Sequence, residues 1–92
     1  MNSSMQGALA DLRVIELSNE RSVFAGKLLA DMGADVILVE PPGGDLMRSY
    51  APFLEDEAGP ERSLYFWHYN TSKRGIVLDL EAEDGRRMLR EL

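Results

Sequence analysis

The sequence predicts an α/β fold in which helices pack on a parallel β-sheet. A strand-like segment, LRVIEL at residues 12–17, and an unbroken apolar run, VILV at 36–39, lie fewer than 30 residues apart. The segment between them has apolar residues at helical spacing, and parallel strands require a crossover of this kind. A third segment, GIVLDL at 75–80, has the same strand character. We therefore expect a βαβ unit that is extended by a third parallel strand.

The first strand is predicted for residues 12–17, where apolar and polar residues alternate. Its core-facing residues are expected to be Leu12, Val14 and Ile15. Arg13 and Glu16 are expected to be less buried, because charged side chains normally face water.

The first helix is predicted for residues 20–32. Ser18 and Asn19 precede it, and both residue types are common N-caps. Gly33 should end the helix, because glycine readily takes the positive φ of the residue after a C-cap. The second strand, 35–40, should be covered on both faces, since its apolar run is not interrupted by polar residues.

Pro41–Gly44 breaks the second strand, and an irregular, acidic stretch is expected over 45–62. A short helix is favoured at 63–69, a third strand at 75–80 and an amphipathic helix at 82–92. The apolar residues of that last helix are Met88, Leu89 and Leu92. Such a stripe needs more protein to pack on, so we expect this chain to be the N-terminal piece of a larger protein.

Composition restricts the class of protein. The 92 residues allow one domain, predicted for 11–92 after a flexible leader at 1–10. The net charge of −6 argues against a general nucleic-acid binder, and the short apolar runs exclude a membrane span. There is no cysteine and no secretory signal, which together favour a cytoplasmic location.

Several residues could have a functional role, but each also has a simpler structural explanation. Glu40 ends a strand as the ribose-binding acid of a dinucleotide fold does, but the preceding loop, SNERSV, lacks the required glycines. Glu40 is then a solvated strand end. His68 has no nucleophile or carboxylate placed beside it by the sequence, which favours a packed histidine over a catalytic one. Ser18 lacks the glycines of a nucleophile elbow.

The remaining charged clusters are expected to be structural. Lys73 and Arg74 precede the third strand and therefore lie opposite the ligand-binding edge of a parallel sheet, where a salt bridge or a subunit contact is expected. The acidic run at 55–57 has no regular ligand spacing, so no metal site is predicted and the run is expected to be a solvated loop.

Two long segments carry a family resemblance. They are FAGKLLADMGADVILVEPPGGDLMRSYAPF, residues 24–53, and SLYFWHYNTSKRGIVLDLEAEDGRRMLREL, residues 63–92. The order and spacing of LLADMGADVI, VEPPGGD and N-x-x-KR-x-x-x-LDL resemble the opening of family III coenzyme A transferases. That group includes formyl-CoA and carnitine-CoA transferases and 2-methylacyl-CoA racemases, and the resemblance covers about residues 9–92.

The resemblance implies a Rossmann-like three-layer fold, the N-terminal part of an interlocked homodimer. It implies coenzyme A as the acyl carrier, an acyl-CoA and a carboxylic acid as substrates, and no metal. The catalytic aspartate of the family, which forms a covalent acyl intermediate, lies beyond residue 92, so no catalytic residue is assigned here. The positions that match the family's CoA-binding segments are Ser18, Asn19, Pro41, Leu78, Asp79, Leu80 and Glu81.

This chain departs from the family pattern at that site. Many members have a basic residue at the positions of Leu38, Pro41 and Glu81, and a carboxylate at 81 would repel the CoA phosphates. The favoured function is an acyl-CoA:carboxylate CoA-transferase, of which this chain alone is inactive. The alternatives are a 2-methylacyl-CoA racemase and a degenerate, non-catalytic domain that binds CoA or a partner.

Overall fold

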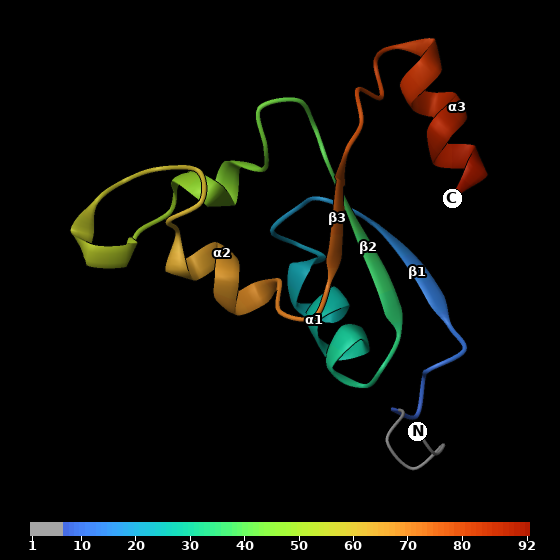
Figure 1. The fold of residues 1–92 in the computed structure, drawn as a ribbon, viewed down its shortest axis with the longest axis horizontal. Coiled ribbons are helices and arrows are strands. Elements are labelled where there is room, and N and C mark those ends of the chain that lie inside the picture. Colours follow the sequence, from blue (N-terminus) through green and yellow to red (C-terminus); the bar gives the residue numbers. More distant parts are fainter. Residues whose placement is uncertain (1–6) are drawn as a thin grey trace.

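The computed structural model describes residues 7–92 and consists of a three-stranded sheet with three helices (Figure 1). The strands and helices are β1 Arg13–Leu17, α1 Val23–Asp31, β2 Asp35–Glu40, α2 Leu64–Tyr69, β3 Arg74–Val77 and α3 Glu83–Glu91. Most of the predicted leader, residues 1–6, lies outside the described residues. Its last part forms a turn in which the Leu9 N–H donates to the Met32 carbonyl over 3.0 Å.

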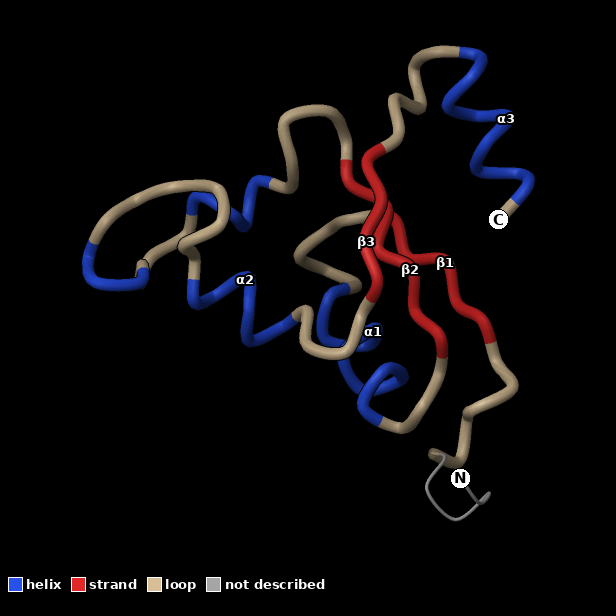
Figure 2. Tube along the Cα trace, viewed as in Figure 1, coloured by secondary structure: helices blue, strands red, loops and turns tan. Residues whose placement is uncertain are grey.

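The sheet has the order β1-β2-β3, and both strand pairs are parallel. Ile15 lies opposite Ile37, and Leu38 lies opposite Gly75. The predicted α/β class and the parallel arrangement are therefore confirmed. Figure 2 shows the helix α1 connecting β1 to β2, as a parallel crossover requires.

Helix α1 begins at Val23 and not at residue 20, so the predicted N-caps were wrong. Ser22 is the N-cap residue, although its side chain makes no capping hydrogen bond. Ser18 and Asn19 belong to the preceding loop. The C-terminal end is as expected, because Gly33 has a φ of +103° and its N–H donates to the Ala30 carbonyl. Together with the bond from the Ala34 N–H to the Leu29 carbonyl, this is a Schellman motif.

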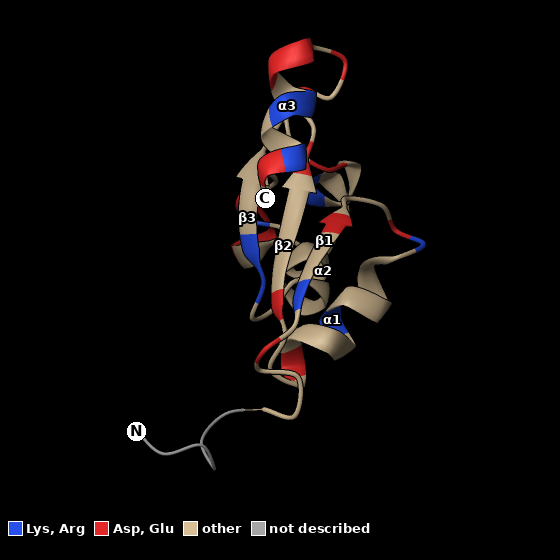
Figure 3. Cartoon of the chain, turned by 90° about the vertical axis from the view of Figure 1, so that its right-hand side faces the viewer, with Lys and Arg blue, Asp and Glu red and all other residues tan. Residues whose placement is uncertain are grey.

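Helices α1 and α2 cover one face of the sheet. Val23, Leu38, Met47 and Phe66 form one apolar cluster on that face, and Ala30, Ala34 and Val36 form a second. Figure 3 looks onto the opposite face, where β1, β2 and β3 lie in front of α1 and α2. We call this opposite face, with Ile15 and Leu17, the open face.

The predicted orientation of β1 was right for Val14, which packs against the second cluster, but wrong for Ile15 and Glu16. Glu16 is 6% exposed and faces the helices, whereas Ile15 and Leu17 are 37% and 51% exposed. The reason is that Glu16 pairs with Leu38 in the sheet register, and Leu38 belongs to the helix-covered core. The burial expected for β2 is confirmed, since all residues from Val36 to Glu40 are buried, although α1 and α2 lie on one face only.

The remaining elements follow the prediction with one change. Residues 64–69 form a helix, and the Ser63 hydroxyl at its N-cap accepts from the Phe66 N–H over 3.1 Å. Strand β3 ends at Val77, three residues earlier than predicted, because the Asp79 carboxylate accepts from the Glu81 N–H and turns the chain. Among residues 7–92, no helix has the length and apolar character that crossing a membrane requires.

Candidate functional site

A pocket of about 270 Å³ lies at the carboxyl ends of all three strands. We call it the strand-end pocket. It is lined by Leu17, Ser18, Val39, Glu40, Pro41, Pro42, Leu78, Asp79, Leu80 and Glu81. Parallel sheets bind ligands outside the carboxyl ends of their strands. Six of the seven residues predicted for the site, all but Asn19, are therefore neighbours at the edge where a ligand is expected.

A second pocket, of about 350 Å³, adjoins the first and shares Ser18 and Pro41 with it. We call it the loop pocket. Its other lining residues are Asn19, Glu20, Arg21, Asp45, Leu46, Met47 and Tyr50. Asn19, the seventh predicted residue, lies here. The two pockets share Ser18 and Pro41 in their linings, and we refer to both together as the crevice.

The loop that follows β2 is fixed by the carboxylate of Glu40. Both Glu40 oxygens accept from the Arg48 guanidinium at 2.7 Å, and Oε2 also accepts from the Asp45 N–H at 2.7 Å. These bonds lower the pKa of Glu40, chiefly through Arg48. Glu40 is 5% exposed, so the expectation of a solvated strand end was wrong. Its oxygens are also occupied and would not be free to bind a ribose.

The same loop depends on two glycines. Gly43 and Gly44 have φ values of +91° and +89°, which side chains rarely adopt. A Cβ atom at Gly44 would come within 2.9 Å of Arg48 Cδ. The sequence PPGGD thus closes a tight turn whose base is the Glu40–Arg48 pair.

The loop that follows β1, residues 18–22, is held by local hydrogen bonds. The Ser18 N–H donates to the Val39 carbonyl at 2.9 Å, and the Arg21 N–H donates to Asn19 Oδ1 at 2.7 Å. The Ser18 hydroxyl is buried and has no hydrogen-bond partner among the described residues. It is therefore an unsatisfied polar group beside the crevice, in a residue that lines both pockets.

The rim of the crevice is acidic. Glu20, Asp45, Asp79 and Glu81 line the two pockets, and Arg21 is the one basic residue in either lining. The Tyr50 hydroxyl donates to Glu20 over 3.1 Å, and this bond raises the pKa of Tyr50. An anionic ligand would meet an unfavourable local potential here, since like charges at close range repel.

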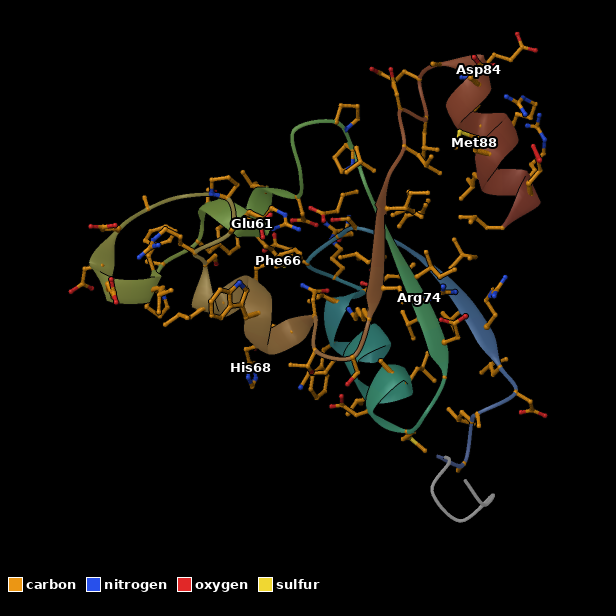
Figure 4. The ribbon with its side chains drawn as sticks, viewed as in Figure 1. Glu61, Phe66, His68, Arg74, Asp84 and Met88 are labelled. Carbon is orange, nitrogen blue, oxygen red and sulfur yellow. The ribbon has the colours of Figure 1, made fainter. Side chains whose placement is uncertain are left out.

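The other predicted residues are outside the crevice. His68 is exposed on α2, its ring lies 4.8 Å from that of Tyr69, and Figure 4 shows it pointing away from the sheet. The sequence favoured a packed histidine, and this prediction was wrong. Lys73 and Arg74 form the expected salt bridges, Lys73 with Glu16 and Arg74 with Asp35. Within residues 7–92, no group of three or more potential metal ligands gathers.

Sequence reasoning missed two residues that shape the crevice. Arg48 was not identified, although an arginine eight positions after a buried acid is a plausible partner for it. Glu16 was assigned to the wrong side of β1. The available signal was that Glu16 lies between two apolar residues near the end of the strand, whereas the other charged residue, Arg13, is at its start.

Comparisons with known proteins agree on one family. A family model described as CoA-transferase family III matches residues 9–92. The chain is 49% identical over 84 residues to succinyl-CoA:mesaconate CoA-transferase of Haloarcula hispanica, covering 87% of this chain and 20% of the relative. It is 41% identical over 80 residues to subunit BbsE of succinyl-CoA:(R)-benzylsuccinate CoA-transferase from Thauera aromatica, with the same coverage of both chains.

A solved structure gives the same result. The crystal structure of a CAIB/BAIF family protein from Brucella suis superposes with a TM-score of 0.81 at 38% identity, covering 94% of this chain and 23% of that one. The chain therefore spans about a fifth of the length of the proteins it matches.

Proposed function

The chain belongs to CoA-transferase family III, and we propose that its strand-end pocket binds the nucleotide end of coenzyme A. The observation that supports this is the gathering of Ser18, Pro41 and residues 78–81 in one pocket at the carboxyl ends of three parallel strands. The complete protein would transfer CoA between carboxylic acids. Its nucleophile would be an aspartate outside residues 1–92, which takes the acyl group covalently.

The substrate class follows from the names of the relatives. Those of the Haloarcula and Thauera proteins both specify succinyl-CoA as the donor. We therefore propose succinyl-CoA as the donor and a second carboxylic acid as the acceptor. The homodimer and the cytoplasmic location expected from the sequence are part of the same proposal, and the racemase alternative has no observation of this chain in its favour.

One observation favours a second function. Five carboxylates line the crevice, and the four that are not paired with Arg48 would weaken binding of a polyanion such as CoA. This supports the alternative of a degenerate domain that binds CoA weakly or only contacts a partner. The two functions differ in the affinity of the complete protein for CoA, which can be measured directly.

The first prediction concerns Glu81. Replacing Glu81 with Lys should tighten CoA binding by a few-fold to about tenfold, because the new charge faces the crevice and attracts phosphate. The gain should shrink as salt is added, since the residue is exposed. Titration calorimetry with CoA and succinyl-CoA, on the complete protein, measures both effects. The isolated 92-residue chain should bind only around the millimolar range, equivalent to ~4 kcal/mol.

Glu83→Lys is the matched control. Glu83 is also exposed and lies two positions along the chain, but it does not line either pocket. Its replacement makes the same charge change and should leave affinity almost unaltered. If the complete protein binds neither CoA nor succinyl-CoA, the degenerate-domain alternative is correct. Equal gains from both substitutions would show that the strand-end pocket is not the site.

A further inference from the structure

The N-x-x-K-R motif at residues 70–74 places one lysine in the interior of the molecule. The Lys73 side chain is 1% exposed. Its ammonium lies 2.8 Å from Glu16 Oε1, donates to Asn70 Oδ1 at 2.8 Å and donates to the Val23 carbonyl at 3.1 Å. The ion-pair partner and the two hydrogen-bond acceptors come from β1, the end of α2 and the first turn of α1.

Glu16 has fewer hydrogen bonds than Lys73. Neither of its oxygens makes a hydrogen bond of regular geometry with a described residue, and only the ion-pair contact with Lys73 compensates its charge. Burial raises the pKa of Glu16, and Lys73 opposes that rise. A buried ion pair of this kind contributes little net stability compared with apolar residues of similar size. Its presence therefore calls for a role other than stability.

Gly26 makes room for the carboxylate beneath α1. A Cβ atom at position 26 would overlap Glu16 Oε1 and lie 3.0 Å from Lys73 Nζ. Any larger residue here would separate α1 from the ion pair. The helix, the strand and the lysine are thus fitted to one another around Glu16.

The ion pair encloses the loop that forms one wall of the crevice. Glu16 and Val23 flank residues 18–22 in the chain, and Lys73 contacts both. Ser18 and Asn19 from this loop line the pockets. Lys73 itself lines neither of those pockets, so it would not touch a ligand bound in the crevice.

We propose that Lys73 and Glu16 are positioning residues that hold the crevice loop, residues 18–22, in its ligand-binding conformation. Lys73 fixes the strand before the loop and the helix after it through two separate bonds. The consequence for CoA binding rests on the function proposed above. The consequence for loop order does not depend on it.

Hydrogen exchange, measured by mass spectrometry on the complete protein, tests loop order. Lys73→Met removes the three contacts while retaining an unbranched side chain. Amides at 18–22 should then exchange at least about tenfold faster. Losing a hydrogen bond to a charged group shifts the equilibrium between the closed and open loop by about that factor. Amides of β2 should change little. Arg74→Met is the matched control, because Arg74 is also ion-paired, but its side-chain bonds to described residues go to Asp35, at the other end of the sheet.

A double variant separates positioning from stability. Glu16→Leu with Lys73→Met replaces the buried charges by apolar groups and should recover most of the stability that Lys73→Met loses. The bond to the Val23 carbonyl stays absent, so exchange at 18–22 should remain fast. Protection of the loop at the wild-type level in a stable double variant would overturn the proposal. If Lys73→Met alone fails to fold, the double variant still gives the result.

Binding supplies the functional test. In the double variant, the dissociation constant for succinyl-CoA should rise about tenfold or more at unchanged folded fraction, and Arg74→Met should bind like the wild type. A double variant with a mobile loop but wild-type affinity would overturn the role in binding. If the wild type binds no CoA thioester, the function proposed above fails, whereas the exchange result still decides whether Lys73 positions the loop.

Discussion

A single guanidinium joins four parts of the chain. Arg48 binds both Glu40 oxygens, donates to the Pro60 carbonyl at 2.8 Å and stacks 4.0 Å from the centroid of the Phe66 ring. It thereby connects the end of β2, the turn at 46–49, the irregular stretch and α2. The planar fork of arginine suits this arrangement, because it can bind a carboxylate in two places and still stack on an aromatic ring.

This pair should make stability depend on pH. The folded pKa of Glu40 lies below its ordinary value of 4.5, so folding favours the ionised form. Glu40→Gln should lower the free energy of unfolding by ~1–3 kcal/mol at neutral pH. The difference from the wild type should persist down to about pH 4.5 and disappear as pH falls through the lower, folded pKa.

Urea titrations of both proteins at a series of pH values measure this difference. Glu61→Gln is the control, because Glu61 is 84% exposed at its side chain and lies 3.6 Å from the same arginine. Its effect should be below ~1 kcal/mol. A difference for Glu40→Gln that stays constant into strong acid would contradict the ion-pair origin.

For single residues, the sequence predicted only some of the ion pairs. It predicted salt bridges for Lys73 and Arg74 from their place before a strand, and the structure has both. It did not predict that Glu16 is buried, because alternation in a five-residue strand is compatible with either face. The register with β2 decides between the faces, and register is a property of two strands and not of one.

At the scale of elements, the C-terminal end of α1 is the best-determined boundary. Gly33 has a φ of +103°, and a Cβ atom there would lie 2.6 Å from the Gly7 Cα. Gly33→Ala should therefore lower the free energy of unfolding by ~1–2 kcal/mol. Thermal or urea unfolding measures the loss.

Gly75→Ala is the control, because it makes the same glycine-to-alanine change at another position. Gly75 lies in β3, its φ is not positive, and a Cβ atom there would meet nothing within 4 Å. This substitution should be neutral or slightly stabilising, because alanine restricts the unfolded chain. Equal losses at the two glycines would show that the positive φ of Gly33 is not what matters.

Element boundaries were predicted less well than element types. Every predicted helix and strand of residues 12–92 exists, but α1 starts three residues later and β3 ends three residues earlier than expected. Local side-chain bonds explain both shifts. Asn19 and Asp79 each accept from a backbone N–H two residues onward, and such turns compete with regular structure.

The whole molecule is more extended than a compact domain. Its radius of gyration is 14.4 Å, whereas a compact domain of this length would have about 12 Å. Figure 1 shows the reason, because α3 and the stretch around 52–62 project from the sheet. The open face adds exposed apolar area at Ile15 and Leu17.

We therefore expect the isolated 92-residue chain to self-associate. Each large apolar side chain left in water forgoes roughly 1.5–3 kcal/mol, and pairing of open faces would recover part of it. Sedimentation over a range of concentrations should show the association, and Ile15→Thr should weaken it while preserving strand propensity. A monomer at all concentrations, with a cooperative melt, would contradict this expectation.

The strand order β1-β2-β3 follows the order of the chain, and this has a consequence during synthesis. Glu16, α1 and β2 leave the ribosome before Lys73 does, at a rate of about 5–20 residues per second. For a period on the order of seconds, the first βαβ unit therefore has no cation for the acid beneath its helix. Until Lys73 emerges, the Glu16 carboxylate lacks its ion-pair partner, so we expect the crevice loop to reach its final order only when the third strand is being made.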